Sequence, residues 1–420
     1  MVMNQSSPPQ LQEDTAQVRA PLSSPALGTG LNRLALPCGD TLRPAVPTPP
    51  DTGPPLALTL SGGGFRATLA GLGVVRLLAD AGLLSRLRYV SSVSGGSIAH
   101  GVLARRWPEL RAAGFTAGAV DRLVIDPVVD SVAHSSMKTQ IVQNIWRAVG
   151  RRTRTDVLAR TLDRRFFDGV RLEDLDAQCR WVFNAANLTT GVRFTFERDV
   201  TGDYVTGLRP TGGTGRTLAS AVAASAAVPG AFAPLRIPAT GFPCAARGDP
   251  LLLDGGAYDN LGLEAFDGDS YRDLFLFAMN AGGVLVTGRA GRIPVIRDLA
   301  RSNSLLYRQS TGLRTRWMVD RFEAWEHARA NNVDPPAWAR QGVLFALATD
   351  VPKADAWRAR YPEHRTWHDE DLAFVPTVFD RLDPALCRLL VYRGWWLTGA
   401  ALTAYHPELL TTEVGAPPPL

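Results

Sequence analysis

The stretch LALTLSGGGFR, residues 56–66, joins a run typical of a buried strand to a turn of three consecutive glycines. A helical pattern with recurring apolar positions follows from 67 to 81. A second stretch, LRYVSSVSGGS at 87–97, repeats the order of strand, sharp turn and helix. Strands joined through a helix pair in parallel and have their faces covered by helices. We therefore predict an α/β fold: a three-layer α/β/α sandwich with a central, mostly parallel sheet and helical insertions.

The length of 420 residues and the apolar content of 45% suit one large α/β domain with insertions. Residues 1–55 hold 11 of the 30 prolines and show no sustained periodicity. We expect a disordered leader there, an ordered domain over 56–405 with a helical insertion at about 108–176, and a loose tail over 406–420.

Four cysteines, Cys38, Cys179, Cys244 and Cys387, lie far apart and form no C-x-x-C pair. This spacing suggests neither a zinc site nor a disulfide framework, so we expect free thiols in a reducing compartment.

Several sequence features bear on location. No basic segment followed by an apolar one opens the chain, as a conventional secretory signal would require. The alanine-rich stretch 217–235 is broken by Pro229, Gly230 and Pro234, whereas a membrane span needs about 20 predominantly apolar residues. We expect a cytoplasmic or peripheral membrane protein and leave export by a non-classical route open.

The net charge of +5 is mildly basic and compatible with anionic membrane surfaces. We expect no nucleic-acid partner. Residues 138–165 contain eight Lys or Arg against two Asp, beside an apolar helical face that includes Trp146 and Val149. Two interpretations remain open: a basic amphipathic surface that meets anionic lipid, or a helix with its apolar face on the core.

Ser94 is the candidate nucleophile. The G-x-S-x-G elbow places a serine on a strained turn between strand and helix, with small residues two places before and after it. Gly96 keeps this pattern, while Ser92 stands where the first glycine is usual. A helix that begins at Gly95 would direct its positive end at the Ser94 hydroxyl. A polar loop with a helix cap, with Ser97 as a capping or packing residue, is the alternative.

Gly62, Gly63 and Gly64 can direct backbone N–H groups at one point, which suits a developing oxyanion. Arg66 adds a positive charge nearby. The turn also fits the G-x-G-x-x-A dinucleotide fingerprint when Ala67 is included. That fingerprint wants an acidic residue at the end of the next strand, which instead ends in two serines. A P-loop lysine is missing as well, so we expect no nucleotide cofactor.

Asp254 is the candidate base because it follows the apolar run 251–253 and precedes two glycines. Ligand sites in open α/β sheets lie at the carboxyl ends of strands. A D-G-G turn with an Asx hydrogen bond is the alternative. An ordinary aspartate pKa near 3.9 is a poor match for a serine hydroxyl, so Asp254 would need to be partly desolvated and hydrogen-bonded to Ser94. The six histidines lie in no recognisable motif, and His100 should point away from the elbow.

Together these residues resemble the patatin-like phospholipase family, which combines a glycine-rich turn, a nucleophile elbow and a later D-G-[GA] motif. Other segments are similar to family segments, in the same order, and extend the resemblance over about 56–400: 184–191, 225–234 and 375–394. The resemblance implies a dyad of Ser94 and Asp254 and an oxyanion hole lined by the three glycines. It also implies contact between Arg66 and the phospholipid phosphate, as in cytosolic phospholipase catalytic domains.

The activity implied by the resemblance is cleavage of carboxylic ester bonds in phospholipids or related acyl lipids through an acyl-enzyme. A phospholipase A or lysophospholipase would fit. We expect no metal or organic cofactor, a lipid substrate and peripheral membrane contact, while the sequence identifies no protein partner. Two alternatives remain: a catalytically silent lipid-binding module of the same fold, and a Ser–His–Asp esterase.

Overall fold

The computed structural model describes residues 37–39, 42–144, 153–283, 294–362, 369–410 and 414–420. Its centre is a ten-stranded mixed sheet in the order β10-β9-β1-β2-β3-β4-β5-β6, with β8 paired to β3 and β7 paired to β8. The strands are β1 (Leu56–Leu60), β2 (Leu87–Ser92), β3 (Arg180–Asn187), β4 (Val192–Phe196), β5 (Val200–Asp203), β6 (Gly207–Pro210), β7 (Leu235–Arg236), β8 (Leu251–Asp254), β9 (Phe275–Asn280) and β10 (Gln341–Ala346). From β10 to β3 the neighbours are parallel, and the other pairs are antiparallel. The predicted α/β class is confirmed, with the parallel order limited to this part of the sheet.

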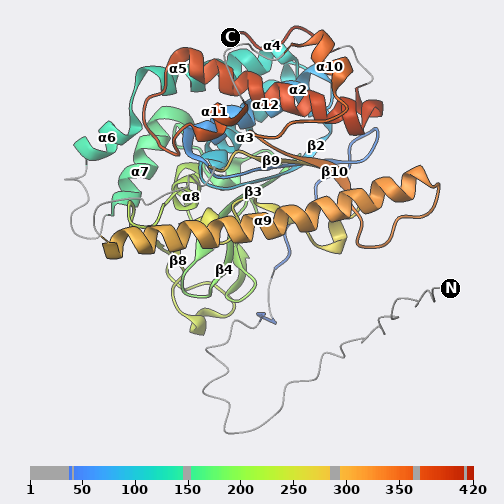
Figure 1. The fold of residues 1–420 in the computed structure, drawn as a ribbon. Coiled ribbons are helices and arrows are strands. Elements are labelled where there is room, and N and C mark those ends of the chain that lie inside the picture. The colour runs from blue at the N-terminus through green and yellow to red at the C-terminus, as the bar shows by residue number, and fades with distance from the viewer. Residues whose placement is uncertain (1–36, 40–41, 145–152, 284–293, 363–368, 411–413) are drawn as a thin grey trace, which may run out of the picture. The chain divides into compact units, whose positions relative to one another are not determined.

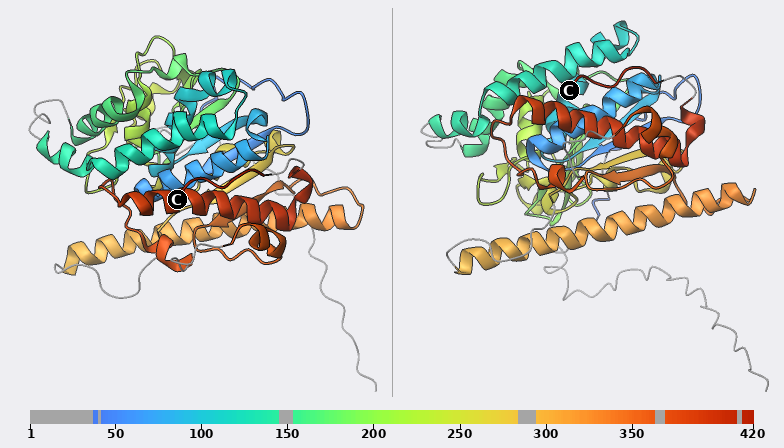
Figure 2. Two further views of the ribbon diagram at one scale, coloured as in Figure 1. Left: turned by 90° about the horizontal axis from the view of Figure 1, so that it is seen from above. Right: turned by 45° about the horizontal axis from the view of Figure 1, so that its top comes forward.

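Helices flank the sheet, as Figures 1 and 2 show. They are α2 (Gly64–Asp80), α3 (Gly95–Ala112), α4 (Ala117–Val120), α5 (Asp126–His134), α6 (Met137–Gln143), α7 (Arg154–Leu162), α8 (Leu218–Ser225), α9 (Pro294–Ala330), α10 (Asp355–Arg360), α11 (Asp369–Phe374) and α12 (Pro384–Tyr405). Helices α4 to α7 fall within the predicted insertion at 108–176, whose residues 145–152 lie outside the described part of the chain.

The two faces of the sheet bury two separate apolar cores. Successive strand side chains point to opposite faces, so Leu56, Leu58 and Leu60 of β1 join a large core with α2, α3 and α12. Ala57 faces the other side, in a smaller core to which α9 contributes Met318. These two cores give the three-layer arrangement that the sequence predicts.

A disulfide bond joins Cys38 and Cys244, so the expectation of free thiols was wrong for these two residues. Cys179 and Cys387 are free and buried. The spacing of cysteines along the chain could not reveal a pair 206 residues apart. The bond attaches one residue of the predicted leader to the domain.

Two arginines of the domain hold the end of the predicted leader. The Arg88 guanidinium donates to the Thr48 carbonyl oxygen at 2.7 Å, and Arg86 donates to the Pro54 carbonyl oxygen at 3.0 Å. Residues 42–55 therefore run along the domain without forming a helix or strand.

Among the helices that the structure describes, none combines the length and the hydrophobicity that crossing a bilayer requires.

Candidate active site

The pairing of β3 brings Ser94 and Asp254 to one place. Strand β2 runs parallel to β3 and ends with Ser92 opposite Phe183. Strand β8 runs antiparallel to β3 and ends with Asp254 opposite Ala185. Because β4 occupies the other side of β3 over both positions, β2 and β8 point at each other along the same side. The turn after β2 carries Ser94 into the gap between the two strand ends.

The Ser94 backbone is strained, with φ 51° and ψ −121° between β2 and α3. A non-glycine residue with positive φ is uncommon and often marks a functional site. The two residues that follow have no room for a side chain: a Cβ atom on Gly95 would lie 2.0 Å from the Gly64 carbonyl oxygen, and one on Gly96 2.5 Å from the Leu60 carbonyl oxygen. These glycines let the elbow pack directly against the first glycine turn.

Asp254 is 7% exposed and lies against the Ser94 hydroxyl. Burial raises the pKa of Asp254 from 3.8 to about 6, because a charged carboxylate is poorly solvated there. Hydrogen bonds from Ser94 and from the Gly256 amide, the latter 2.8 Å long, oppose this rise in the pKa. The result is a carboxylate that is ionised near neutral pH yet basic enough to accept a proton.

Hydroxyl groups behind the elbow satisfy its backbone. The Ser94 amide donates to Ser225 Oγ at 3.0 Å, and the Ser225 hydroxyl donates to the Asn184 carbonyl oxygen at 2.6 Å. Ser97 Oγ lies 2.9 Å from Ser225 Oγ. Ser225 thus links α8 and β3 to the turn and holds the strained Ser94 backbone in position.

His100 is a packed core residue. It is fully buried, its ring stacks on Phe183 at 4.0 Å between centroids, and its Nδ1 lies 2.7 Å from Ser92 Oγ. Burial lowers the pKa of His100 well below 6.5, so the ring is neutral. Ser92 stands where the usual elbow pattern has a glycine, and its hydroxyl forms a hydrogen bond with His100. His364 and His368 lie outside the described residues.

The glycine turn lies in contact with the elbow. The Gly62 amide donates to the Asn260 carbonyl oxygen at 3.0 Å. Within the described residues the Gly63 and Gly64 amides have no hydrogen-bond partner. Gly64 has φ +61°, and Gly63 has φ +150° with a Cβ position only 2.3 Å from the Ala281 carbonyl oxygen. Two of the three predicted oxyanion donors are thus unpaired, while the Gly62 amide is already engaged.

Arg66 is buried and donates hydrogen bonds within the protein. Its guanidinium binds the carbonyl oxygens of Ala281 at 3.0 Å, Ala373 at 3.2 Å and Val375, and the Thr377 hydroxyl at 3.1 Å. Burial lowers the pKa of Arg66 to about 10. These bonds connect the start of α2 to the residue after β9 and to the segment before α12. The phosphate contact implied by the resemblance stays a prediction.

Two site residues were missed by the sequence reasoning, Asn260 and Tyr307. Asn260 is 4% exposed, and its Nδ2 has no hydrogen-bond partner among the described residues. Its Oδ1 is 2.3 Å from the Cβ position of Gly62 and 2.8 Å from that of Gly256. A Cβ on Gly282 would lie 3.1 Å from Asn260 Nδ2 and 2.6 Å from the Tyr307 hydroxyl.

Tyr307 also interacts electrostatically with Asp254. Burial and the nearby Asp254 carboxylate raise the pKa of Tyr307 well above its ordinary value, so its hydroxyl keeps its proton. Its helical sequence context gave no signal of this contact. Asn260 follows Asp254 by six residues, and that short spacing was the one available signal.

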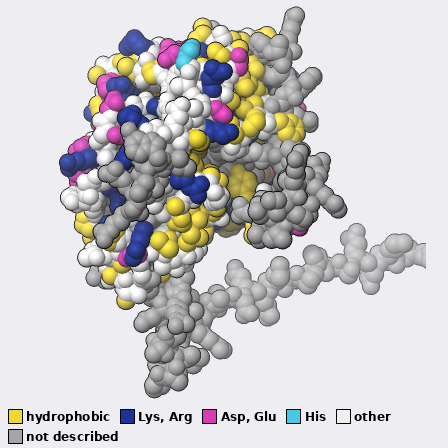
Figure 3. All heavy atoms as spheres, turned by 90° about the vertical axis from the view of Figure 1, so that its left-hand side faces the viewer, with side chains coloured by type: hydrophobic (Ala, Val, Ile, Leu, Met, Phe, Trp, Pro, Cys, Tyr) yellow, Lys and Arg dark blue, Asp and Glu magenta, His cyan; other side chains and the backbone are white. Residues whose placement is uncertain are grey.

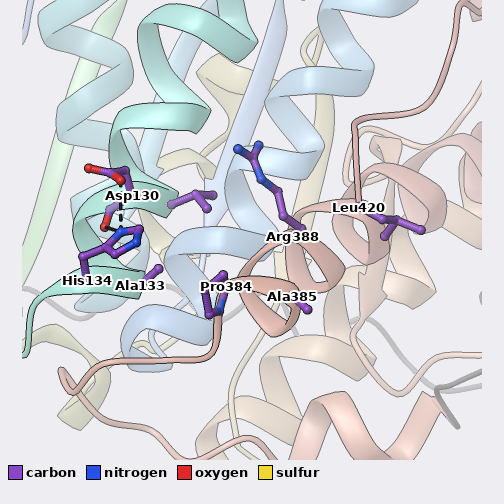
Figure 4. Close-up of a pocket in the computed structure, with 8 residues that line it drawn as sticks. Asp130, Ala133, His134, Pro384, Ala385, Arg388 and Leu420 are labelled. Atoms are coloured by element: carbon purple, nitrogen blue, oxygen red, sulfur yellow. Dashed lines mark hydrogen bonds and ion pairs between the residues drawn. The ribbon is translucent and has the colours of Figure 1, made fainter.

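A surface cavity of about 400 Å³ lies elsewhere, lined by residues of α5 and α12 and by Leu420. Figure 4 shows its Asp130 and His134 joined by an ion pair, with His134 Nδ1 and Asp130 Oδ1 3.0 Å apart. None of the residues named above for the Ser94 site lines it, so we do not assign it to that site.

The architecture is that of an α/β protein in which a strained serine between strand and helix lies against a buried aspartate. The family model for patatin-like phospholipases matches residues 58–267, and the chain belongs to this family.

Similar solved structures include human GIVD cytosolic phospholipase A2, at 13% identity and a TM-score of 0.44 over 85% of this chain and 60% of that chain. The same human protein in complex with methyl gamma-linolenyl fluorophosphonate matches at 15% identity and a TM-score of 0.41, over 85% of this chain and 59% of that one. VipD from Legionella pneumophila matches at 13% identity and a TM-score of 0.30, over 81% and 70%. The chain spans about 60% of the human structure's length. No curated protein sequence matches the chain.

Proposed function

We propose that this protein is a serine acyl hydrolase that cleaves carboxylic ester bonds of phospholipids or related acyl lipids. The observation that carries the proposal is the meeting of the β2 and β8 ends, where strained Ser94 lies against the buried Asp254 carboxylate. Membership of the patatin-like phospholipase family supports a lipid substrate.

The first half-reaction uses the dyad directly. The Asp254 carboxylate takes the hydroxyl proton of Ser94 as Ser94 Oγ bonds to the ester carbonyl carbon. The carbonyl oxygen becomes an oxyanion and accepts hydrogen bonds from the unpaired Gly63 and Gly64 amides. The tetrahedral intermediate then collapses, the bond to the alcohol oxygen breaks, and protonated Asp254 gives its proton to the leaving alcohol.

In the second half-reaction, water takes the place of the alcohol and Ser94 becomes the leaving group. Asp254 takes a proton from water as the water oxygen bonds to the acyl carbon. The bond from that carbon to Ser94 Oγ breaks, the carboxylic acid leaves, and Asp254 returns the proton to Ser94. The burial of Asp254 keeps its pKa raised, and the half-buried Tyr307 and the buried Asn260 lie at the same site.

The test is a matched pair of variants, Ser94→Ala and Asp254→Asn, assayed on phospholipid vesicles and on a short-chain acyl ester. Each should lower kcat by about a thousandfold or more, because each removes one partner of the proton transfer. Ser220→Ala, a change on the partly exposed side of α8, is the control and should keep wild-type rates.

If either folded variant hydrolysed its substrates at the wild-type rate, the assignment of Ser94 and Asp254 as catalytic residues would be wrong. A fluorophosphonate probe distinguishes the hydrolase from the catalytically silent lipid-binding module. The probe should label Ser94 in an active hydrolase and leave Ser94 unlabelled in a silent module.

A further inference from the structure

Helix α9 presents two different faces. Tyr307, Arg314, Met318 and Phe322 follow one another at intervals of seven and four residues and face the protein. Met318 and Phe322 are buried in the smaller core, and Arg314 pairs with Glu264 at 3.1 Å. Figures 1 and 2 show α9 as one continuous helix along the molecule. The sheet side of this helix is thus fixed by packing and charge.

A second stripe of α9, about 100° around the helix axis from the first, is apolar and exposed, and we call it the outer face of α9. Leu306, Leu313 and Trp317 recur at intervals of seven and four residues, and Leu305 adjoins them. Their exposed fractions are 63%, 52%, 37% and 60%, respectively. Single exposed apolar side chains are normal, but several on one helix face mark an interaction surface.

Arginines lie among these apolar side chains, and the exposed carboxylate of Asp320 lies one turn beyond Trp317. From 301 to 317 the helix contains four arginines and no carboxylate. Arg314 is turned inward, while the exposed Arg308 and Arg316 lie beside the leucines. The Arg321 guanidinium stacks on the Trp317 ring at 3.8 Å from its centroid. Leucine and tryptophan beside arginine form the pattern of a helix that lies in the interface of an anionic bilayer.

We propose that the outer face of α9 docks this protein on the surface of an anionic lipid membrane. The choice of lipid as the occupant rests on the proposed hydrolase function, because Tyr307 of the same helix reaches the Asp254 site. A second copy is a poorer fit: a two-fold self-contact would bring the arginines of α9 against each other. Docking through α9 brings the lipid surface to the helix that borders the active site.

The basic segment 138–165 offers a competing surface. The described helices there turn apolar residues inward: α6 buries Met137 and Ile141, and α7 buries Val157, Leu158 and Leu162. Trp146 and Val149 lie outside the described residues. Figure 3 shows the side of the molecule that carries these helices, where the Lys and Arg side chains are spread among apolar and acidic ones. Val142, with an exposed fraction of 59%, is the exposed apolar side chain of α6.

The experiment measures co-sedimentation of the full chain with vesicles of phosphatidylcholine containing phosphatidylglycerol. The triple variant Leu305→Ser, Leu306→Ser and Leu313→Ser should bind about tenfold more weakly than wild type. The matched control replaces three equally exposed apolar residues elsewhere and should bind as wild type does: Val142→Ser, Leu188→Ser and Val333→Ser. Equal loss in the control, or no loss in the α9 variant, overturns the proposal.

A second pair of variants tests the charge. Arg308→Gln with Arg316→Gln should weaken binding to the anionic vesicles about fivefold to tenfold and lose its effect in high salt. Arg122→Gln with Arg381→Gln removes the same net charge from other exposed positions and should have little effect. Equal weakening by both pairs would mean that net charge, rather than α9, governs binding.

Two further measurements separate this proposal from the proposed function. The leucine variant should hydrolyse a monomeric short-chain ester at the wild-type rate, and Ser94→Ala should bind vesicles like wild type. Failure of ester hydrolysis by the wild type would count against the hydrolase function and leave vesicle binding as the test of α9. A lower molar mass of the leucine variant in light scattering would show a contact between copies and overturn lipid docking.

Discussion

In the proposed mechanism, the protonation state of Asp254 determines whether Ser94 can be activated. Its side chain is buried, so the charged form loses solvation, and the hydrogen bonds from Ser94 and Gly256 recover only part of that loss. The raised pKa makes Asp254 a stronger base than an exposed aspartate. The proposed proton transfer requires the ionised form of Asp254. As the pH falls, this form becomes protonated at a higher pH than an ordinary aspartate does.

The pH dependence of the reaction should therefore follow Asp254. Since its pKa is raised to about 6, the base is ionised above that pH and protonated below it. We expect kcat/KM on a short-chain ester to fall about tenfold for each pH unit below about 6. Thermal melting over the same pH range serves as the control for unfolding. A profile that stays flat down to pH 4 would contradict the role of Asp254 as base.

Local motifs in the sequence were enough to select Ser94, Asp254 and the glycine turn as the candidate site. The sequence could not predict that the Gly62 amide donates to the Asn260 carbonyl oxygen, because Asn260 belongs to a distant segment. Tyr307 was missed for the same reason, because helical periodicity does not say which residue faces a remote carboxylate. The buried bonds of Arg66 likewise depend on segments more than 200 residues away.

Among the secondary-structure elements, α12 packs closely against α2, the helix that begins at the glycine turn. A Cβ atom on Gly394 of α12 would lie 1.9 Å from the Ala70 carbonyl oxygen of α2, and one on Gly73 would lie 2.0 Å from the Val391 carbonyl oxygen. The backbones thus touch on both sides of the crossing. Helix α2 begins at Gly64, so a shift of this helix would move the Gly63 and Gly64 amides that we propose as oxyanion donors.

Gly394→Ala should destabilise the protein by about 1–3 kcal/mol, because the added methyl group forces two packed helices apart. Gly312→Ala in α9 is the control. Its Cβ would meet nothing closer than 3.7 Å, so the better helix propensity of alanine should stabilise the protein by up to about 1 kcal/mol. Chemical denaturation measures both. Equal effects from the two substitutions would mean that the close crossing contributes nothing to stability.

The predicted elements agree with the structure where hydrophobic periodicity is strong. The sequence predicted a strand and a helix over 56–81 and a strand, turn and helix start over 87–97, and the structure has β1, α2, β2 and the start of α3 there. Strands β5, β6 and β7 were not predicted. Each has four residues or fewer, and such short segments owe their extended form to pairing with a neighbour rather than to their own sequence.

Across the whole domain, the Cys38–Cys244 bond joins two segments that lie 206 residues apart in the sequence. Cys38 lies before β1, and Cys244 lies between β7 and β8, which carries Asp254. The bond closes a loop of about 200 residues that contains Ser94 and the glycine turn. Disulfides are typical of oxidising compartments, so the bond argues against the reducing environment expected from the cysteine spacing.

Removing this bond should cost stability without touching the dyad. In the chain-entropy description a closed loop of this length contributes about 5 kcal/mol by restricting the unfolded chain, and removal of a native disulfide typically costs about 2–5 kcal/mol. We expect Cys38→Ser with Cys244→Ser to lower the free energy of unfolding by that amount and to keep ester hydrolysis. A reducing agent should destabilise the wild type equally and leave the double variant unchanged, which excludes effects through Cys179 and Cys387. Alkylation of the unfolded, unreduced protein should label two of the four thiols, and labelling of all four would show that the bond does not form.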